Sequence, residues 1–142
     1  MKISVHYLWS MATLFAMAPG AHAADPAAAM QPSTERVISH ADMKKVLARP
    51  DDTVILDVRR NSDYDKDMLT MPAAQRFDPD KVTEWSAALP KDKEILLFCA
   101  HGRSISDATV NFLTKNGYKA RLVAGGFDSW KDAGGATVPK SK

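Results

Sequence analysis

Cys99 is the residue whose type and setting most clearly point to chemistry. It is the only cysteine, an apolar run at 95–98 leads into it, and the loop at 99–104 reads Cys-Ala-His-Gly-Arg-Ser, with one cation and no acid. The backbone N–H groups of such a loop, and the N-terminus of a following helix, stabilise an anion. A thiolate or a persulfide is such an anion, so the pattern predicts a reactive sulfur. The alternative is a buried cysteine that packs as a small hydrophobe.

The loop residues predict a sulfur-transfer site. A thiolate at Cys99 can attack the outer sulfur of thiosulfate and keep it as a persulfide, which a second thiol or cyanide then removes. A pocket of N–H donors with one cation is sufficient for this chemistry. Cys99 is therefore the candidate catalytic residue, and the candidate substrate-binding residues are Ala100, His101, Gly102, Arg103 and Ser104.

Two of these loop residues have more than one interpretation. Arg103 either binds the sulfonate group of the donor or points to solvent. His101 either relays a proton, binds the substrate anion, or is a solvent-facing loop residue. The residue types alone leave these alternatives open.

Other cysteine chemistries fit this loop less well. A cysteine phosphatase or an arsenate reductase needs an arginine six positions after the cysteine, where this chain has Ile105, and its loop must hold a tetrahedral oxyanion. A thioredoxin-like redox role needs a second cysteine, which the chain lacks.

The elements that must position Cys99 follow an alternating pattern. The apolar runs at 53–58 and 95–98 are typical of strands buried on both faces of a parallel sheet, and shorter strands are expected at 36–38, 74–77 and 120–123. Helices are expected between them, so the chain is of the α/β class. Asp57 and Cys99 lie near the carboxyl ends of the two strongest strands, where such sheets bind ligands. Asp57 either accepts hydrogen bonds that shape the Cys99 loop or pairs with Arg59 to brace its strand end.

The helices are delimited by capping residues. Ser39 is the expected N-cap of a helix at 41–49, Ser104 the N-cap of a helix that Asn116-Gly117 ends, and Gly125-Gly126 opens a last helix to about 131, with Trp130 in the core. Further helices are expected at 61–68 and 80–88.

The N-terminal segment resembles a secretory signal. Residues 1–23 combine Lys2, a short apolar run at 8–17 and the small-x-small sequence Ala21-His22-Ala23. A membrane-spanning helix needs about 20 apolar residues, which disfavours the alternative of an uncleaved anchor. We therefore expect a flexible lead-in at 24–34, one domain at 35–134 and a loose tail at 135–142, in a periplasmic protein with no membrane attachment after cleavage.

Composition narrows the function classes. The 142-residue chain has a formal charge of +2, of which the signal carries one unit, so no nucleic-acid partner is expected. The histidines outside the signal are His40 and His101, and with Cys99 they are too scattered for a metal site. No metal and no cofactor are expected. A single cysteine in an exported protein cannot form an internal disulfide.

Three motifs together resemble a known family. They are Leu56-Asp57-Val58-Arg59, the six-residue loop Cys99 to Ser104, and Gly125-Gly126-Phe127-Asp128-Ser129-Trp130. In order and at strand ends, they resemble a single-domain rhodanese of the thiosulfate sulfurtransferase family. The pair Gly102-Arg103 is similar to small exported rhodaneses of the phage-shock type.

The resemblance implies a three-layer α/β fold, with a central parallel sheet of about five strands flanked by helices. It implies that Cys99 carries the persulfide, that the loop amides hold it, and that Asp57 and Arg59 support the site. The implied partners are a small-molecule sulfur donor and a thiol or cyanide acceptor, with a protein thiol as a further candidate. The alternative is a non-catalytic persulfide carrier or a rhodanese-like interaction module.

The chain also departs from the family pattern. The segment 69–74 lacks the Gly-His pair that usually follows the first motif, and Ser104 and Ile105 replace the usual end of the loop. These departures place the donor preference in question more than the fold.

Overall fold

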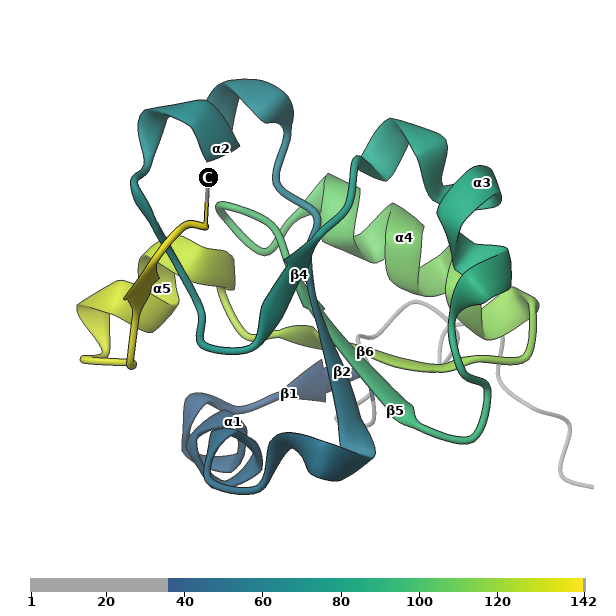
Figure 1. Cartoon of the computed structure of the whole chain (residues 1–142), viewed down its shortest axis with the longest axis horizontal. Helices are drawn as coiled ribbons and strands as arrows, with labels where there is room; N and C mark the ends of the chain where they lie inside the picture. Colours follow the sequence, from purple (N-terminus) through teal and green to yellow (C-terminus); the bar gives the residue numbers. More distant parts are fainter. Residues whose placement is uncertain (1–35, 142) are drawn as a thin grey trace, which may run out of the picture. The chain divides into compact units, whose positions relative to one another are not determined.

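The computed structural model describes residues 36–141 (Figure 1). The expected signal at 1–23 and lead-in at 24–34 lie outside the described residues. Within residues 36–141 no helix is long and apolar enough to cross a membrane.

A five-stranded parallel sheet forms the centre of the domain, which confirms the expected α/β class. Its order is β1-β6-β5-β2-β4, with bounds Val37–Ile38, Lys119–Val123, Glu94–Phe98, Thr53–Asp57 and Ala74–Arg76. The two strongest expected strands, β2 and β5, are neighbours, and their register pairs Asp57 with Phe98. Asp57 and Cys99 therefore reach the same edge of the sheet, as the pattern predicts.

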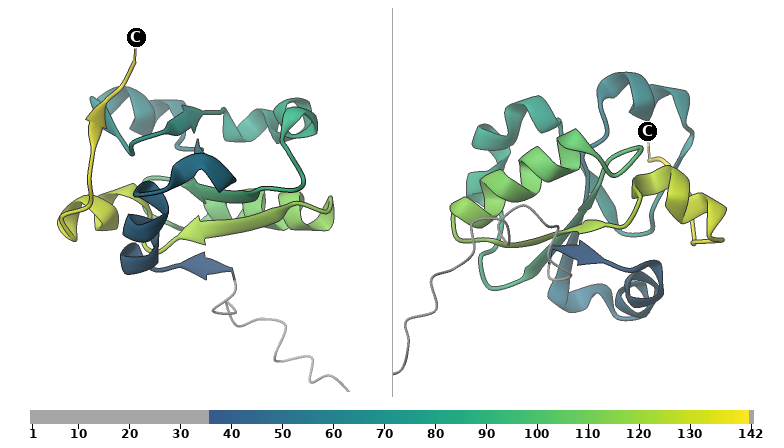
Figure 2. Two further views of the ribbon diagram at one scale, coloured as in Figure 1. Left: turned by 60° about the horizontal axis from the view of Figure 1, so that its bottom comes forward. Right: turned by 180° about the vertical axis from the view of Figure 1, so that it is seen from behind.

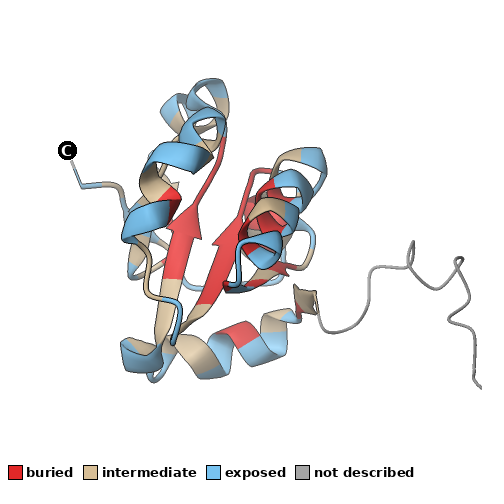
Figure 3. Ribbon diagram, turned by 90° about the vertical axis from the view of Figure 1, so that its right-hand side faces the viewer, coloured by how far each residue is buried: buried red, intermediate tan, exposed pale blue. Residues whose placement is uncertain are grey.

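Helices cover both faces of the sheet, because the strand residues alternate between two apolar clusters. One cluster packs β-strand residues such as Ile55 and Phe98 against α1 (His40–Leu47) and α5 (Gly126–Asp132). The other packs residues such as Leu56 and Leu97 against α4 (Ser104–Lys115) and α3 (Val82–Trp85). Figure 2 shows these elements from two further sides, and Figure 3 shows buried residues concentrated in the strands.

One expected helix is divided in the structure. The segment expected as one helix at 80–88 is divided into turns of 3₁₀-helix at Pro79–Lys81 and Ser86–Ala88 around α3. Two side chains donate to backbone carbonyl groups in and next to this segment: the Trp85 indole to Asp78 O at 2.7 Å and the Tyr118 hydroxyl to Ser86 O at 2.5 Å. The helix expected at 61–68 is confirmed as α2 (Asn61–Lys66), which ends earlier than expected.

Of the two serine N-caps that the sequence predicts, one is present and the other is not. Ser39 caps α1 as expected, because its hydroxyl accepts the Asp42 N–H at 3.1 Å. Ser104 does not cap α4, which is a correction: the N-cap residue is Arg103, whose carbonyl accepts the Asp107 N–H at 3.1 Å. Gly102, with φ of 61°, turns the chain one residue earlier than the serine pattern suggested.

Within residues 135–141 the tail contains a paired strand, which corrects the expectation of a loose segment at 135–142 for the part that the structure describes. Strand β7 (Val138–Pro139) pairs antiparallel with β3 (Leu69–Thr70), a short strand that the sequence did not reveal. The fully buried Trp130 holds the approach to β7, because its indole N–H donates to Ala136 O at 2.8 Å. Trp130 thus anchors α5 in the core, as predicted, and the tail as well.

Candidate active site

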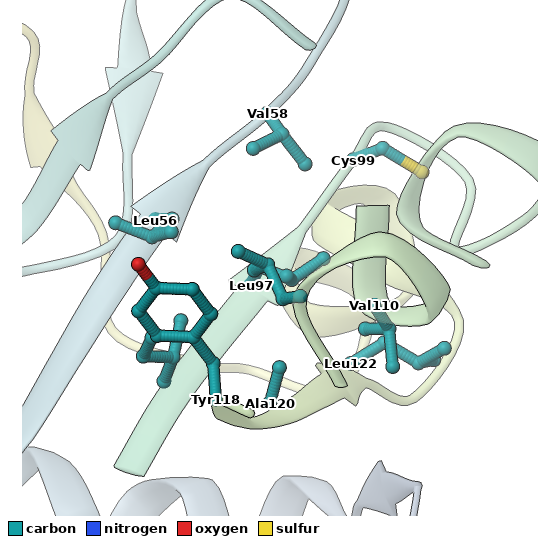
Figure 4. Close-up of a cluster of buried hydrophobic side chains, with 10 residues drawn as sticks. Leu56, Val58, Leu97, Cys99, Val110, Tyr118, Ala120 and Leu122 are labelled. Atoms are coloured by element: carbon teal, nitrogen blue, oxygen red, sulfur yellow. The ribbon is translucent and has the colours of Figure 1, made fainter. Parts of the chain in front are cut away.

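The Cys99 sulfur lies at the end of β5 and lines a pocket of about 240 Å³. The residue is only 4% exposed and closes one end of the cluster that contains Val58 and Leu97. Figure 4 shows its sulfur directed away from Leu56 and Tyr118. One side-chain partner lies close: Ser106 Oγ is 3.3 Å from Cys99 Sγ. Cys99 is thus almost fully buried and at the same time lines a pocket.

The loop after Cys99 presents its N–H groups without protein partners. Within residues 36–141, no backbone N–H from Ala100 to Ser106 donates to another protein group. Ala100 is buried, Ile105 is half-buried, and both line the pocket. N–H donors in such positions normally have an acceptor, which an anion in the pocket would supply. The N–H groups from Ala100 to Ser106 also include the first ones of α4, a 12-residue helix, whose dipole favours a negative charge at this end.

The carbonyl groups of the loop point the other way, toward α5. Phe127 N–H donates to Cys99 O at 2.8 Å, and Asp128 N–H donates to Ala100 O at 3.0 Å. The approach requires Gly126, because a Cβ there would come within 2.6 Å of Cys99 O. The Gly-Gly motif thus allows the loop carbonyl groups of Cys99 and Ala100 to bond to α5, while the loop N–H groups keep no protein partner in the part of the chain that the structure describes.

Three charged side chains line the Cys99 pocket. Arg103 is the cation that the sequence predicts, and Arg60 and Asp63, at the start of α2, are two that it did not. Arg103 and Arg60 are both exposed, so each contributes charge at the pocket without being buried. Ile105 also lines the pocket and packs on the core, which puts an apolar side chain where a phosphatase would place its arginine.

His101 lies at the pocket mouth, 66% exposed, and pairs with α5. Its Nδ1 is 2.9 Å from an Asp128 oxygen, and Lys131 Nζ is 3.4 Å from the other oxygen. Lys131 also donates to Asp67 at 2.6 Å. The exposed-loop interpretation of His101 is thus nearest the structure, with Asp128 as a partner that the sequence did not predict.

The ion pair between Asp67 and Lys131 shifts the pKa of both side chains. Burial alone would raise the pKa of Asp67, but the hydrogen bonds from Lys131 and from Leu69 N–H together hold that pKa below 3.8. The hydrogen bond to Asp67 in turn raises the pKa of Lys131 above 10.5, against the opposing effect of burial. The pair is therefore charged across the neutral range and ties α5 to the segment before β3.

Asp57 and Arg59 form a buried pair beneath the loop, each 1% exposed. The Arg59 guanidinium donates to Asp57 from Nε at 2.9 Å and from a terminal nitrogen at 2.5 Å, and Thr70 Oγ1 donates at 3.0 Å. Arg59 also lies 4.5 Å from the Phe127 ring centre. Among the described residues these contacts occupy the carboxylate, which favours the brace interpretation of Asp57 over direct shaping of the loop.

The structure brings the sequence-predicted residues together around one pocket. Cys99, Ala100, His101, Arg103 and Ser104 line it, while Gly102 packs behind against Gly126. Sequence reasoning missed residues at two places: Ser106, seven positions after the cysteine, and the Arg60–Asp63 pair at the start of α2. Cys99 precedes the helix that carries Ser106, so no helical spacing in the sequence links the two residues. Within residues 36–141 no group of three or more metal-ligating side chains is found.

Comparisons with known proteins agree with this geometry. The rhodanese-like domain family matches residues 39–133. A thiosulfate sulfurtransferase GlpE of Coxiella burnetii is 33% identical over 95 residues, covering 66% of this chain and 85% of that protein. Another GlpE, of Tolumonas auensis, is 30% identical over 78 residues, covering 54% and 71%. The crystal structure of a rhodanese-related protein from Thermoplasma volcanium has a TM-score of 0.64 at 28% identity, covering 74% of this chain and 99% of its own. The chain therefore belongs to the rhodanese-like domain family.

Proposed function

We propose that this protein is a sulfurtransferase that moves the outer sulfur of thiosulfate to a thiol or to cyanide through a persulfide on Cys99. In the first step the Cys99 thiolate attacks the outer sulfur, an S–S bond forms, and the S–S bond of thiosulfate breaks to release sulfite. In the second step an acceptor thiolate or cyanide attacks the outer sulfur of the persulfide. The persulfide bond breaks, the electron pair returns to Cys99, and a new persulfide or thiocyanate leaves.

The observation that carries this proposal is the set of unpartnered N–H groups around the Cys99 pocket. A persulfide places its negative charge on the outer sulfur, beyond Sγ and toward the pocket. The unpartnered N–H groups of the pocket-lining residues Ala100, His101, Arg103, Ser104 and Ile105 can hold that charge without any acid or base. A volume of about 240 Å³ accommodates a small anion rather than a large substrate.

The charges at the pocket support a dianionic donor. Arg60 and Arg103 bring two guanidinium groups and Asp63 one carboxylate, which leaves a net positive charge beside the sulfur. Guanidinium groups bind planar oxyanion faces such as a sulfonate in a bidentate manner. The two relatives named thiosulfate sulfurtransferase support the same donor.

The sulfur acceptor distinguishes the proposed enzyme from the alternative, a persulfide carrier or an interaction module. A persulfide that forms but is not removed by cyanide or small thiols would indicate a carrier that passes sulfur to a protein thiol, or an interaction module. Turnover with small acceptors would indicate an enzyme in its own right. The altered sequence at the end of the loop, Ser104 and the half-buried Ile105, is the feature that keeps the carrier alternative open.

We also propose that the protein acts in the periplasm after removal of residues 1–23. Support comes from Lys2, the apolar run at 8–17 and the small residues before position 24. Expression of the full chain in a Gram-negative host, followed by fractionation and N-terminal sequencing, tests this. We expect a periplasmic product that begins at Ala24. A cytoplasmic product that retains Met1 would contradict it.

The activity test is a steady-state assay of thiocyanate formation from thiosulfate and cyanide. We expect the wild-type protein to turn over and Cys99→Ser to lose all measurable rate. Equal rates in both proteins would rule out the proposed mechanism, because no other cysteine is present to carry the sulfur.

A further inference from the structure

The hydroxyl of Ser106 makes a contact for which the loop amides provide no substitute. Ser106 is fully buried, and among residues 36–141 it is the one group within hydrogen-bonding distance of the Cys99 sulfur, at 3.3 Å. Its Oγ also lies 2.9 Å from Arg103 O. The hydroxyl has one proton, so it can donate a hydrogen bond either to the carbonyl or to the sulfur, but not to both at once.

The carbonyl does not depend on that proton. Arg103 O already accepts the Asp107 N–H at 3.1 Å, as the first hydrogen bond of α4. The Ser106 hydroxyl can therefore rotate to the sulfur without leaving a buried acceptor unsatisfied. Hydroxyl protons rotate freely to suit their acceptors, so no backbone movement is needed.

We infer that Ser106 is a catalytic residue that donates a hydrogen bond to Cys99 Sγ whenever that sulfur carries negative charge. This inference rests on the proposed function, and it divides the negative charge between two sets of donors. Ser106 serves the inner sulfur, and the loop amides serve the outer one. In the thiol form the sulfur donates to Ser106 Oγ, and the hydroxyl proton faces Arg103 O.

The charge on Sγ appears at two points of the reaction. It is present in the free thiolate that attacks the donor, and it returns in the second step, when Sγ becomes the leaving group and the electron pair of the persulfide bond moves onto it. In the resting persulfide the charge lies on the outer sulfur, and the hydroxyl can return to Arg103 O. Ser106 therefore acts most strongly on thiolate formation and on sulfur release to the acceptor.

The first test is the pH profile of Cys99 alkylation by iodoacetamide, followed by intact mass. Ser106→Ala should move its midpoint upward by about one pH unit, because a hydrogen bond to an ionised group is lost. Thr109→Val is the matched control: Thr109 is buried on the same helix and donates to Ile105 O at 2.8 Å but does not contact the sulfur. We expect its midpoint to match the wild type.

The second test separates the two half-reactions at a pH above both midpoints. With the thiol fully ionised, thiosulfate should load Ser106→Ala at close to the wild-type rate. Removal of the persulfide sulfur by cyanide should be slower by about threefold or more, because a more basic sulfur is a poorer leaving group. A purely structural role for Ser106 would change neither the midpoint nor the balance between the half-reactions.

Two features keep these tests decisive. Alanine favours the helix more than serine does, so Ser106→Ala is expected to fold. Ser106→Thr is a second variant that keeps the hydroxyl and should keep the wild-type midpoint. The alkylation profile needs no sulfur donor, so it tests Ser106 even if thiosulfate loads no sulfur on the wild type, a result that would count against the proposed function alone. A Ser106→Ala profile that coincides with that of Thr109→Val would overturn the inference.

Discussion

Gly102 and Gly126 lie backbone to backbone, and this contact fixes the loop that surrounds the candidate nucleophile. A Cβ on Gly102 would come within 2.5 Å of Gly126 N, and a Cβ on Gly126 would meet Gly102 N more closely still. Both residues have positive φ, at 61° and 70°. The Cys-x-x-Gly loop and the Gly-Gly motif are far apart in the sequence, and this contact brings them together.

This contact predicts an unequal effect of alanine at two glycines. Gly134 also has positive φ, at 68°, but no atom lies within 4 Å of a Cβ there, so Gly134→Ala should cost about 1 kcal/mol from backbone strain. Gly126→Ala adds a backbone clash and should cost about 3 kcal/mol or more. Urea denaturation of the two variants measures the difference. Equal free energies of unfolding would show that the loop contact is not as tight as described.

The Asp57–Arg59 pair predicts a large loss when one partner is removed. Asp57→Ala leaves a buried guanidinium without its carboxylate and should lower the free energy of unfolding by about 3–5 kcal/mol. The double variant Asp57→Leu with Arg59→Met should recover much of that loss, because no charge stays buried. Glu94→Ala, which breaks the half-exposed pair with Arg121, is the control and should cost about 1 kcal/mol or less. A small effect of Asp57→Ala would contradict the role of this pair as a brace.

The Asp67–Lys131 pair predicts a pH-dependent contribution to stability. The lowered pKa of Asp67 gives a contribution that is present above about pH 4 and lost as the pH falls through that lowered pKa. The raised pKa of Lys131 gives one that is present below 10.5 and lost as the pH rises through the raised value. Asp67→Asn should therefore be less stable than the wild type from about pH 5 to 9, with the gap closing in acid.

Denaturation at several pH values measures this gap, and Lys45→Met, at the more exposed pair with Asp42, should show a smaller one. A gap between Asp67→Asn and the wild type that stays constant down to about pH 2 would mean that the effect is not electrostatic.

The two arginines at the pocket predict a change in donor affinity. Arg103→Ala and Arg60→Ala should each raise the KM for thiosulfate by about threefold to tenfold, because each removes a charge that faces the donor anion. Reaction with an uncharged persulfide donor should change little. Arg49→Ala, an exposed arginine outside the Cys99 pocket, is the matched control. An unchanged KM in either pocket variant would show that this arginine is a solvated surface residue and does not bind the donor.

The parts of the site that the sequence predicts are those tied to strong local patterns. Apolar runs place β2 and β5, so the edge shared by Asp57 and Cys99 follows from the rule for parallel sheets. The strands β3 and β7 have two residues each, too few for any alternation to show. Their pairing depends on Trp130, which holds Ala136 across a turn that no local pattern indicates.

The residues that sequence reasoning missed have roles set by tertiary contacts. Arg60 and Asp63 resemble ordinary surface charges at a helix start until α2 is placed over the Cys99 loop. Ser106 lies in the first turn of α4, and its contact with the Cys99 sulfur joins that turn to the residue that follows β5.

The most direct test of the central claim is the intact mass of the protein after incubation with thiosulfate. We expect the wild type to gain one sulfur atom, to lose it when cyanide is added, and to lose it again on each later cycle of loading and removal. Cys99→Ser should gain none under the same conditions. A wild-type protein that gains no sulfur from thiosulfate, or a Cys99→Ser variant that gains as much, would contradict the account.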